Sequence, residues 1–345
     1  MDITVTIATV NRADGLAKTL EALLGQDSSR ASFEVIVADN GSTDHTKEVC
    51  DRYASKFEHF TYLFDGRPGQ MVGWHRAIAI SQGEVCCFID DDVCPKSTWL
   101  AGVNDAYQNL DVGLATGPIQ LAFEVEPPEW IRFMMIGEPG AQTLPVFGLL
   151  DCGDEARDIP GNFVWGTNFT IRKSCLLEVK GFHPCAMPAR LLRFYGDGEI
   201  YVGRAVEALG RRVLYHPDIS VIHHIHSARL TSQAIKSKFT TTGFSRSFAL
   251  LRQLGKAYEL PSEGEFRAMA LRYFPDPEGT PEELIQTVHD GLLTGVSQHL
   301  KSFIEDINFR EWVLRDNYLD IDKCYVHPEL IEERNLKRTA DWRSG

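Results

Sequence analysis

The chain has 345 residues, 43% of them hydrophobic and 24% charged, which is typical of a globular protein with one large or two modest domains. Its formal net charge of −13 excludes nucleic acid as a general partner, because binding to the phosphate backbone needs a basic surface. No apolar run reaches the roughly 20 residues of a membrane-spanning helix, and no signal peptide is visible at the start. We therefore expect a cytoplasmic protein.

The eight cysteines are scattered, without a Cys-x-x-Cys pair. Two of them, Cys86 and Cys87, are adjacent in an apolar run, where free thiols behave as small hydrophobic side chains. The pattern predicts free cysteines in a reducing compartment rather than a disulfide framework.

The first 121 residues alternate between two periodicities. Short apolar runs predict strands, and the amphipathic segments between them predict helices. This alternation predicts an α/β fold with a mostly parallel sheet and helices on both faces. The predicted strands are Ile3–Val10, Phe33–Asn40, 60–64, 84–90 and 112–121, and the helices include one with Leu16, Leu20, Leu23 and Leu24 on one face, one capped by Ser42 or Thr43, one at Val72–Ser81 and one with Trp99, Val103 and Tyr107.

Polar residues follow the carboxyl ends of these strands, where open α/β sheets bind ligands. The most unusual stretch is "CCFIDDDV", in which a buried strand runs into three carboxylates that repel one another. Their position at the ligand-binding edge favours a metal ion among them over the alternatives, a solvated turn or a helix N-cap at Asp92. The residues expected at this edge are Thr9, Asn11, Arg12, Asp39, Asp65, Asp90, Asp91 and Asp92.

The pattern changes after residue 121. A Pro- and Gly-rich stretch at 122–165 predicts a long irregular crossing, and a helix at Asp197–Leu209 and two strands follow. Beyond Leu230 the pattern is mainly helical, with one long amphipathic stretch from Pro281 to about Trp312. We predict a first domain at 1–228, with a nucleotide-binding half at 1–121 and an acceptor half at 122–228, followed by a helical region at 229–345.

Six segments in order, "ATVNR", "VADNGSTD", "FIDDDV", "GTNFTIRK", "YGDGEIYVGRAVEALGRRVLYHP" and "VIHH", resemble the family 2 type of nucleotide-sugar glycosyltransferase with the GT-A fold. The resemblance covers roughly residues 1–250. It implies a metal-dependent enzyme of hexosyltransferase type that moves a sugar from a nucleotide-sugar to an acceptor hydroxyl with inversion.

The resemblance also implies roles at the nucleotide end of the site. Asp39 would bind the nucleotide base, which favours UDP as the donor nucleotide because a carboxylate accepts from an imide N–H. Thr9, Asn11, Arg12, Asp65 and Asp91 would lie beside the nucleotide. Asp90 would approach the ribose or the metal, and Asp92 would bind the metal, with His223 as a further ligand. A coordination shell of carboxylate and imidazole ligands suits Mn²⁺, or less readily Mg²⁺.

At the sugar end, the resemblance makes Asp197 the general base that takes the proton of the acceptor hydroxyl. Glu199 keeps the place of a later family acid, and Gly196 stands where the family has Glu. Asp197 could alternatively only cap its helix. Trp165, Gly166, Asn168 and Glu199 are the expected sugar and acceptor contacts, although Trp165 could equally be a core residue.

Two features depart from the family pattern or lie outside it. Trp74 and His75 stand where the family often has Arg-Asn facing the nucleotide. From Ile225 to Tyr258 there are no acidic residues. This segment could close over the diphosphate, bind an anionic acceptor, contact the inner face of a membrane through 229–256, or form a solvated helix face. Its basic residues are Arg229, Lys236, Lys238, Arg246, Arg252 and Lys256.

Two alternatives to a glycosyltransferase belong to other functional classes. A catalytically inactive GT-A protein would bind nucleotide or act as a scaffold. A sugar nucleotidyltransferase would need a Gly-rich basic loop after the first strand, where this chain has "TVNRADG". The acceptor could be a glycan, a lipid-linked molecule, a protein or a small molecule, and the chain could form oligomers.

Overall fold

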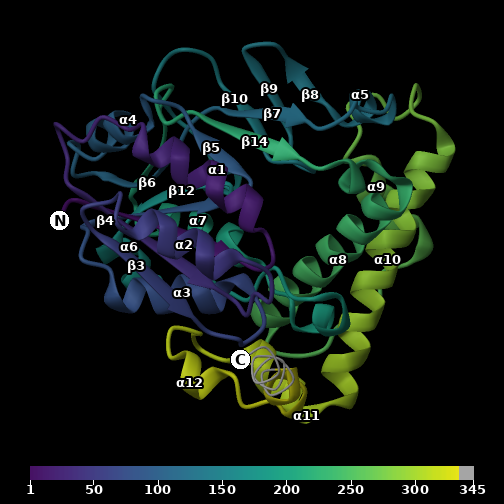
Figure 1. Ribbon diagram of the computed structural model, residues 1–345. Helices are drawn as coiled ribbons and strands as arrows, with labels where there is room; N and C mark the ends of the chain where they lie inside the picture. Colours follow the sequence, from purple (N-terminus) through teal and green to yellow (C-terminus); the bar gives the residue numbers. More distant parts are fainter. Residues whose placement is uncertain (334–345) are drawn as a thin grey trace.

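The computed structural model describes residues 1–333 of the chain. Its larger sheet has the strand order β11-β13-β6-β12-β4-β1-β2-β3, and β1 pairs in parallel with both β2 and β4 (Figure 1). Strands β11 and β12 run antiparallel to their neighbours. The predicted mostly parallel α/β sheet is thus confirmed. The strands are β1 (Ile3–Thr9), β2 (Phe33–Asp39), β3 (Phe60–Phe64), β4 (Val85–Asp90), β6 (Val112–Thr116), β11 (Arg157–Asp158), β12 (Asn168–Arg172) and β13 (Arg212–Tyr215).

Helices cover both faces of this sheet because alternate side chains of a strand enter two separate cores. In β4, Phe88 packs in one core with Trp74, whereas Ile89 packs in the other with Leu20. The first core is covered by α3 (Gln70–Ile80), α6 (Lys173–Glu178) and α7 (Gly198–Ala208), and the second by α1 (Ala13–Leu24), α2 (Thr46–Ala54) and α4 (Trp99–Ala106).

The structure corrects the expected strand at 112–121. The chain turns at Gly117, where an added Cβ would lie 2.3 Å from the carbonyl oxygens of His216 and Ile219. Strand β6 stays in the larger sheet, and β7 enters a second sheet with the order β5-β14-β7-β10-β9-β8. The expected irregular crossing therefore contains strands. The second sheet has β5 (Val93–Pro95), β7 (Ile119–Phe123), β8 (Ile136–Glu138), β9 (Ala141–Leu144), β10 (Leu149–Asp151) and β14 (Val221–Ile225). The short helices between β7 and α7 in the sequence are α5 (Trp130–Met134), η1 (Gly161–Phe163) and η2 (Ala189–Phe194).

Two helix boundaries also differ from expectation. Helix α2 begins at Thr46, not after Ser42 or Thr43, and the Asp44 carboxylate accepts the backbone N–H of Thr46 at 3.1 Å. The long helix expected from Pro281 breaks at Asp306, whose carboxylate accepts two N–H groups of the next helix. A side chain that satisfies free N–H groups at a helix start favours a new helix there.

The C-terminal region is helical, as predicted. Helices α8 and α10 lie side by side (Figure 1). They approach closely because Gly243 and Gly295 face each other, and a Cβ on Gly295 would lie 2.1 Å from the carbonyl oxygen of Thr240. No helix in residues 1–333 is long and apolar enough to cross a membrane. The helices are η3 (Ser227–Leu230), α8 (Ser232–Leu254), α9 (Glu263–Leu271), α10 (Glu282–Glu305), α11 (Ile307–Leu314) and α12 (Ile321–Cys324).

The end of this region returns to the first half of the chain. The Tyr325 hydroxyl donates to the Pro68 carbonyl at 2.8 Å, and Arg67 pairs with Asp322 at 2.6 Å. Phe248 and Trp312 share a core with Trp74 of α3. The helical region thus packs directly on the sheet domain, and the boundary at 228 stays a prediction. All eight cysteines are free.

His75 makes this packing sensitive to pH. Its Nδ1 donates to the Tyr318 carbonyl at 2.8 Å, and its Nε2 accepts the Phe182 N–H at 2.9 Å, so the ring is held neutral. Burial lowers the pKa of His75 from 6.5 to about 4. Between these values the unfolded chain binds a proton that the folded chain does not. We therefore expect the free energy of unfolding to fall by on the order of 3 kcal/mol as the pH drops through this window.

Urea unfolding at several pH values between 4 and 7 measures this loss. In a His75→Asn variant the pH dependence should be weaker, because the amide binds no proton, whereas a variant of the exposed His226 to Asn should keep the wild-type dependence. Equal pH dependence in His75→Asn and the wild type would contradict the assignment.

Candidate functional site

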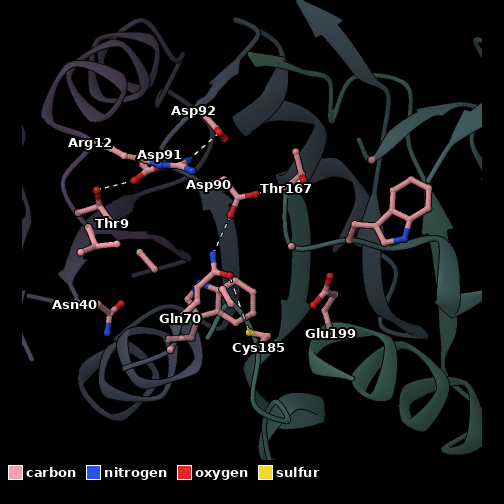
Figure 2. Close-up of a pocket in the computed structure, with 18 of the residues that line it drawn as sticks. Thr9, Arg12, Asn40, Gln70, Asp90, Asp91, Asp92, Thr167, Cys185 and Glu199 are labelled. Carbon is pink, nitrogen blue, oxygen red and sulfur yellow. Dashed lines mark hydrogen bonds and ion pairs between the residues drawn. The ribbon is translucent and has the colours of Figure 1, made fainter. Parts of the chain in front are cut away.

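A cavity of about 560 Å³ opens at the carboxyl edge of the larger sheet (Figure 2). It is enclosed by the ends of β1 and β4, the first turn of α3, the loop before β12, the start of α7, and residues of β14, η3 and α8. The parallel register places Thr9 beside Asp39 and Ala8 beside Asp90, so these strand ends meet at one edge. The lining includes Thr9, Arg12, Gln70, Asp90, Asp91, Asp92, Trp165, Gly166, Thr167, Glu199, His223, Arg229 and Lys238.

The middle carboxylate of the three, Asp91, is part of the scaffold. It is buried, and it accepts the Thr9 hydroxyl at 2.6 Å and the Arg12 guanidinium at 2.9 Å. Arg12 also donates to Asp92 at 2.9 Å (Figure 2). Thr9, Arg12 and Asp91 were expected to touch the nucleotide. In the structure they hold one another and orient Asp92.

Asp90 is held from two sides. The Gln70 amide donates to one carboxylate oxygen at 2.9 Å, and the Thr167 hydroxyl donates to the other at 3.3 Å. Gly69 allows this because its φ of 98° turns the chain so that Gln70 begins α3 at the pocket. Burial and the charge of Asp92 raise the pKa of Asp90, so a cation at this place would relieve unfavourable charge.

Strand pairing brings His223 to Asp92. Strand β5 directly follows the three aspartates and pairs with β14, in which His223 lies opposite Val93. His223 Nδ1 contacts the Phe147 carbonyl oxygen at 2.9 Å, which only accepts, so this nitrogen carries the proton. Nε2 accordingly presents a lone pair, and it accepts from the Arg229 guanidinium at 3.2 Å.

The same lone pair faces a carboxylate oxygen without a partner. Asp92 Oδ1 is buried, makes no hydrogen bond and lies 3.5 Å from His223 Nε2. A cation that takes the place of the Arg229 guanidinium at Nε2 would fit between this carboxylate oxygen and the imidazole. Within residues 1–333 no group of three or more His, Cys, Asp or Glu side chains could hold a metal ion by itself. Asp92 and His223 could therefore supply only part of the ligands of an ion.

Glu199 and Asp197 occupy different places at the start of α7. Glu199 lines the cavity, and burial raises the pKa of its carboxyl (Figure 2). Asp197 does not line the cavity, and its Oδ1 lies 2.5 Å from Nδ1 of the buried His183, whose ring stacks on Tyr201. Of these two carboxylates, Glu199 faces the cavity and the expected Asp197 does not, and the catalytic role of Asp197 stays a prediction.

Asp39 lies beneath the loop that follows β2. It is 2% exposed, accepts the backbone N–H groups of Gly41 and Ser42, and accepts the Tyr62 hydroxyl. It is absent from the cavity lining, whereas the neighbouring Asn40 belongs to it. Its carboxylate is thus committed to three hydrogen bonds, and its expected contact with a base stays a prediction.

Asn11 and Asp65 also have internal partners. Asn11 has a φ of 53°, and its Oδ1 accepts the Thr43 N–H at 2.7 Å, which ties the loops after β1 and β2 together. Asp65 pairs with Arg67 at 2.5 Å and with Arg76 at 3.8 Å. Neither lines the cavity, and their expected contacts with the nucleotide stay predictions.

Of the expected sugar contacts, Trp165 and Gly166 line the cavity, but Asn168 does not. Asn168 is fully buried; its Oδ1 accepts the Trp99 indole N–H at 3.0 Å and its amide donates to the Ile219 carbonyl at 2.8 Å. Both ends of its amide are used inside the core, and the expectation that Asn168 binds sugar stays a prediction.

We expect Asn168→Ala to lower the free energy of unfolding by about 1–3 kcal/mol, because it leaves two buried polar groups without partners. The midpoint of urea unfolding measures the loss. Asn162→Ala, at an exposed position in the preceding segment, is the matched control and should change little. A loss of ligand affinity without loss of stability in Asn168→Ala would restore the binding role.

Three contributors were not identified as site residues from sequence. Gln70 and Thr167 orient Asp90, and Phe147 fixes the tautomer of His223. Gln70 could have been found, because it directly follows the Gly that starts a helix after the third strand. The Phe147 contact is made by a backbone carbonyl, so no side-chain motif could have indicated it.

The fold and the acidic site at the strand ends define a class of α/β proteins that bind ligands at a sheet edge. The sequence model of glycosyl transferase family 2 matches residues 4–177, about half of the chain. The chain belongs to this family.

Two curated relatives come from Haloferax volcanii. Glycosyltransferase AglE is 28% identical over 122 residues, which is 35% of this chain and 40% of that protein. Glucosyl-dolichyl phosphate glucuronosyltransferase is 19% identical over 253 residues, which is 71% of this chain and 76% of that protein. The chain thus spans less than half of the length of AglE.

Among solved structures, the chain is similar to the mannosyltransferase PcManGT of Pyrobaculum calidifontis in complex with GDP-Man and Mn²⁺. The TM-score is 0.50 at 14% identity, and the match covers 98% of this chain and 84% of that one. At this identity the likeness concerns the fold, and it agrees with the predicted GT-A fold and its helical C-terminal extension.

Proposed function

We propose that the protein is a metal-dependent glycosyltransferase that moves a sugar from a nucleotide-sugar to an acceptor hydroxyl with inversion. The observation that carries the proposal is the buried, unpartnered oxygen of Asp92 opposite the His223 lone pair, in a cavity that also holds Glu199. Family membership supports the reaction class. The mannosyltransferase neighbour, solved with GDP-Man and Mn²⁺, supports the use of a nucleotide-sugar and a divalent ion.

Asp92 and His223 would hold the divalent ion, with Asp90 beside it. When bound, the ion would neutralise the charge of the leaving nucleoside diphosphate. Mn²⁺ suits the imidazole ligand better than Mg²⁺ does. Arg12 fixes Asp92, and Gln70 with Thr167 fixes Asp90, so the carboxylates keep their positions while a substrate enters.

Glu199 would act as the general base. It takes the proton from the acceptor hydroxyl as the oxygen attacks the anomeric carbon, and the bond to the diphosphate breaks on the opposite face. In Figure 2, Glu199 lies apart from Asp90, Asp91 and Asp92. A base on the side of the sugar opposite the diphosphate would give inversion of the anomeric configuration. Asp197, paired with His183, would hold the start of α7 and so position Glu199.

UDP remains the proposed donor nucleotide, on the family position of Asp39. Calorimetric titration of UDP, GDP and CDP, with Mn²⁺ and again with EDTA, tests this. We expect UDP to bind most tightly and only with the metal. Tighter binding of GDP or CDP would change the donor and leave the reaction class intact. No metal-dependent binding of any of the three would contradict the transferase and favour a protein that has kept only the fold.

A further inference from the structure

Two cations of the helical region face the cavity. Arg229 of η3 and Lys238 of α8 both belong to its lining. They lie in the segment from Ile225 to Tyr258, which contains no acidic residue. In a chain with a net charge of −13, this acid-free segment brings two positive charges to a cavity that also holds carboxylates, and these cations could contact an anionic ligand.

The two cations differ in their partners. Arg229 donates to His223 Nε2 at 3.2 Å, and Asp92 and Asp90 are the acidic charges nearest to it, so it belongs to the end of the site proposed for the diphosphate. The Lys238 ammonium makes no hydrogen bond or ion pair within residues 1–333. Its charged neighbours are Arg229, Glu199 and Asp90. Glu199 is thus the acidic residue that acts most strongly on Lys238, whereas Asp92 has that place for Arg229.

Lys236 provides the contrast within the same helix. It does not line the cavity, and its ammonium lies 3.6 Å from the Asp290 carboxylate of α10. Lys238 has no such partner, although the cavity walls and Arg229 lower its pKa and thus disfavour its charge. An exposed ammonium that faces the cavity without a counter-ion can bind an anionic group that enters there. An ammonium suits a single phosphate or carboxylate group, since it acts as a point charge.

We infer that Lys238 binds a second anionic group of the substrates, separate from the diphosphate: a carboxylate or phosphate carried by the transferred sugar or by the acceptor. The electrostatic interaction of Lys238 with Glu199 supports this, because the sugar and the acceptor hydroxyl would meet at the base, whereas the diphosphate would lie at Asp92 and His223. The inference rests on the proposed function and assigns its substrate class.

The donor arm of the test compares UDP-glucose with UDP-glucuronate, which differ in one carboxylate on the sugar. Each is titrated into the wild type, Lys238→Gln and Lys236→Gln in Mn²⁺. If the anion is on the transferred sugar, the wild type and Lys236→Gln bind UDP-glucuronate more tightly by roughly 10- to 100-fold, and Lys238→Gln loses this preference.

The acceptor arm uses the same three proteins saturated with UDP and Mn²⁺. Inorganic phosphate is titrated into each, with glucose as the neutral control. If the anion is on the acceptor, phosphate binds to the wild type and to Lys236→Gln and at least about 10-fold more weakly to Lys238→Gln. In both arms, UDP itself binds equally to the wild type and Lys238→Gln.

Equal behaviour of Lys238→Gln and the wild type in both arms overturns the inference, and intact UDP binding then leaves the proposed function standing. Failure of UDP, GDP and CDP alike to bind the wild type with metal overturns the proposed function and this inference with it. The two failures are therefore distinguishable.

Discussion

Glu199→Gln should reduce the rate of UDP release from a UDP-sugar by a factor of about 10²–10⁴, the usual contribution of a general base. The amide keeps the shape of the side chain but cannot take the acceptor proton. UDP affinity should stay unchanged, since Glu199 lies away from Asp92 in the cavity (Figure 2). The measurement is a continuous assay of UDP release with water or added sugars as acceptors, beside calorimetry of UDP binding.

Two variants make this result specific. Glu207→Gln removes an exposed carboxylate from the same helix and should retain wild-type rates. Asp197→Asn should lower thermal stability through its lost partner His183 and reduce the rate less than Glu199→Gln does. A large loss of rate in Asp197→Asn with little loss in Glu199→Gln would assign the role of general base to Asp197 instead.

The pH profile gives a second readout of Glu199. A base acts only when deprotonated, and burial raises the pKa of this carboxyl above its ordinary value of 4.5. The rate should therefore fall as the pH drops through the raised pKa, and this acidic limb should disappear in Glu199→Gln. An unchanged limb in the variant would assign the titration to another group.

Loss of a residue that only supports a metal ligand weakens metal binding by roughly 10- to 100-fold. Asp92→Asn removes a proposed ligand itself, so we expect it to weaken UDP binding in Mn²⁺ by more than this. The amide removes the charge that, with His223, would hold the ion. Because the effect acts through the metal, the wild type and Asp92→Asn should bind UDP equally weakly in EDTA. Calorimetry of UDP under both conditions measures this.

A matched control replaces a carboxylate outside the site. Asp105 pairs with Arg30 at the surface, and Asp105→Asn should keep metal-dependent UDP binding. A difference between Asp92→Asn and the wild type that persists in EDTA would show that Asp92 contacts the nucleotide without a metal.

The sequence already determined the sheet edge at which the site lies. Parallel strands end at the same edge, so the periodicity of the first 121 residues was enough to bring Thr9, Arg12 and the three aspartates together. The parallel register of β1 with β2 and β4 confirms that the ends of these strands lie at one edge. The amphipathic periodicity of the last third of the chain likewise predicted its helices.

The direction of each side chain could not be predicted from the sequence. This direction decides which residues face the cavity and which of their neighbours do not. Adjacent residues at a strand point to opposite faces, so Thr167 reaches Asp90 while Asn168, one position later, enters the core. Residues at the start of a helix point in directions that depend on how the helix is docked, so Glu199 faces the cavity while Asp197 meets His183. A motif identifies such a group without showing which member faces the substrate.

Contacts between distant segments belong wholly to the tertiary structure. His223 lies at Asp92 because β14 pairs with β5, and its tautomer depends on a backbone carbonyl at Phe147. Lys238 reaches the same cavity from α8, whose place is set by close packing against α10 at Gly243 and Gly295. Local sequence determines strands, helices and their polar ends, because these depend on neighbouring residues. The partner of each side chain depends on which elements pack together, and that arrangement is set by the whole chain.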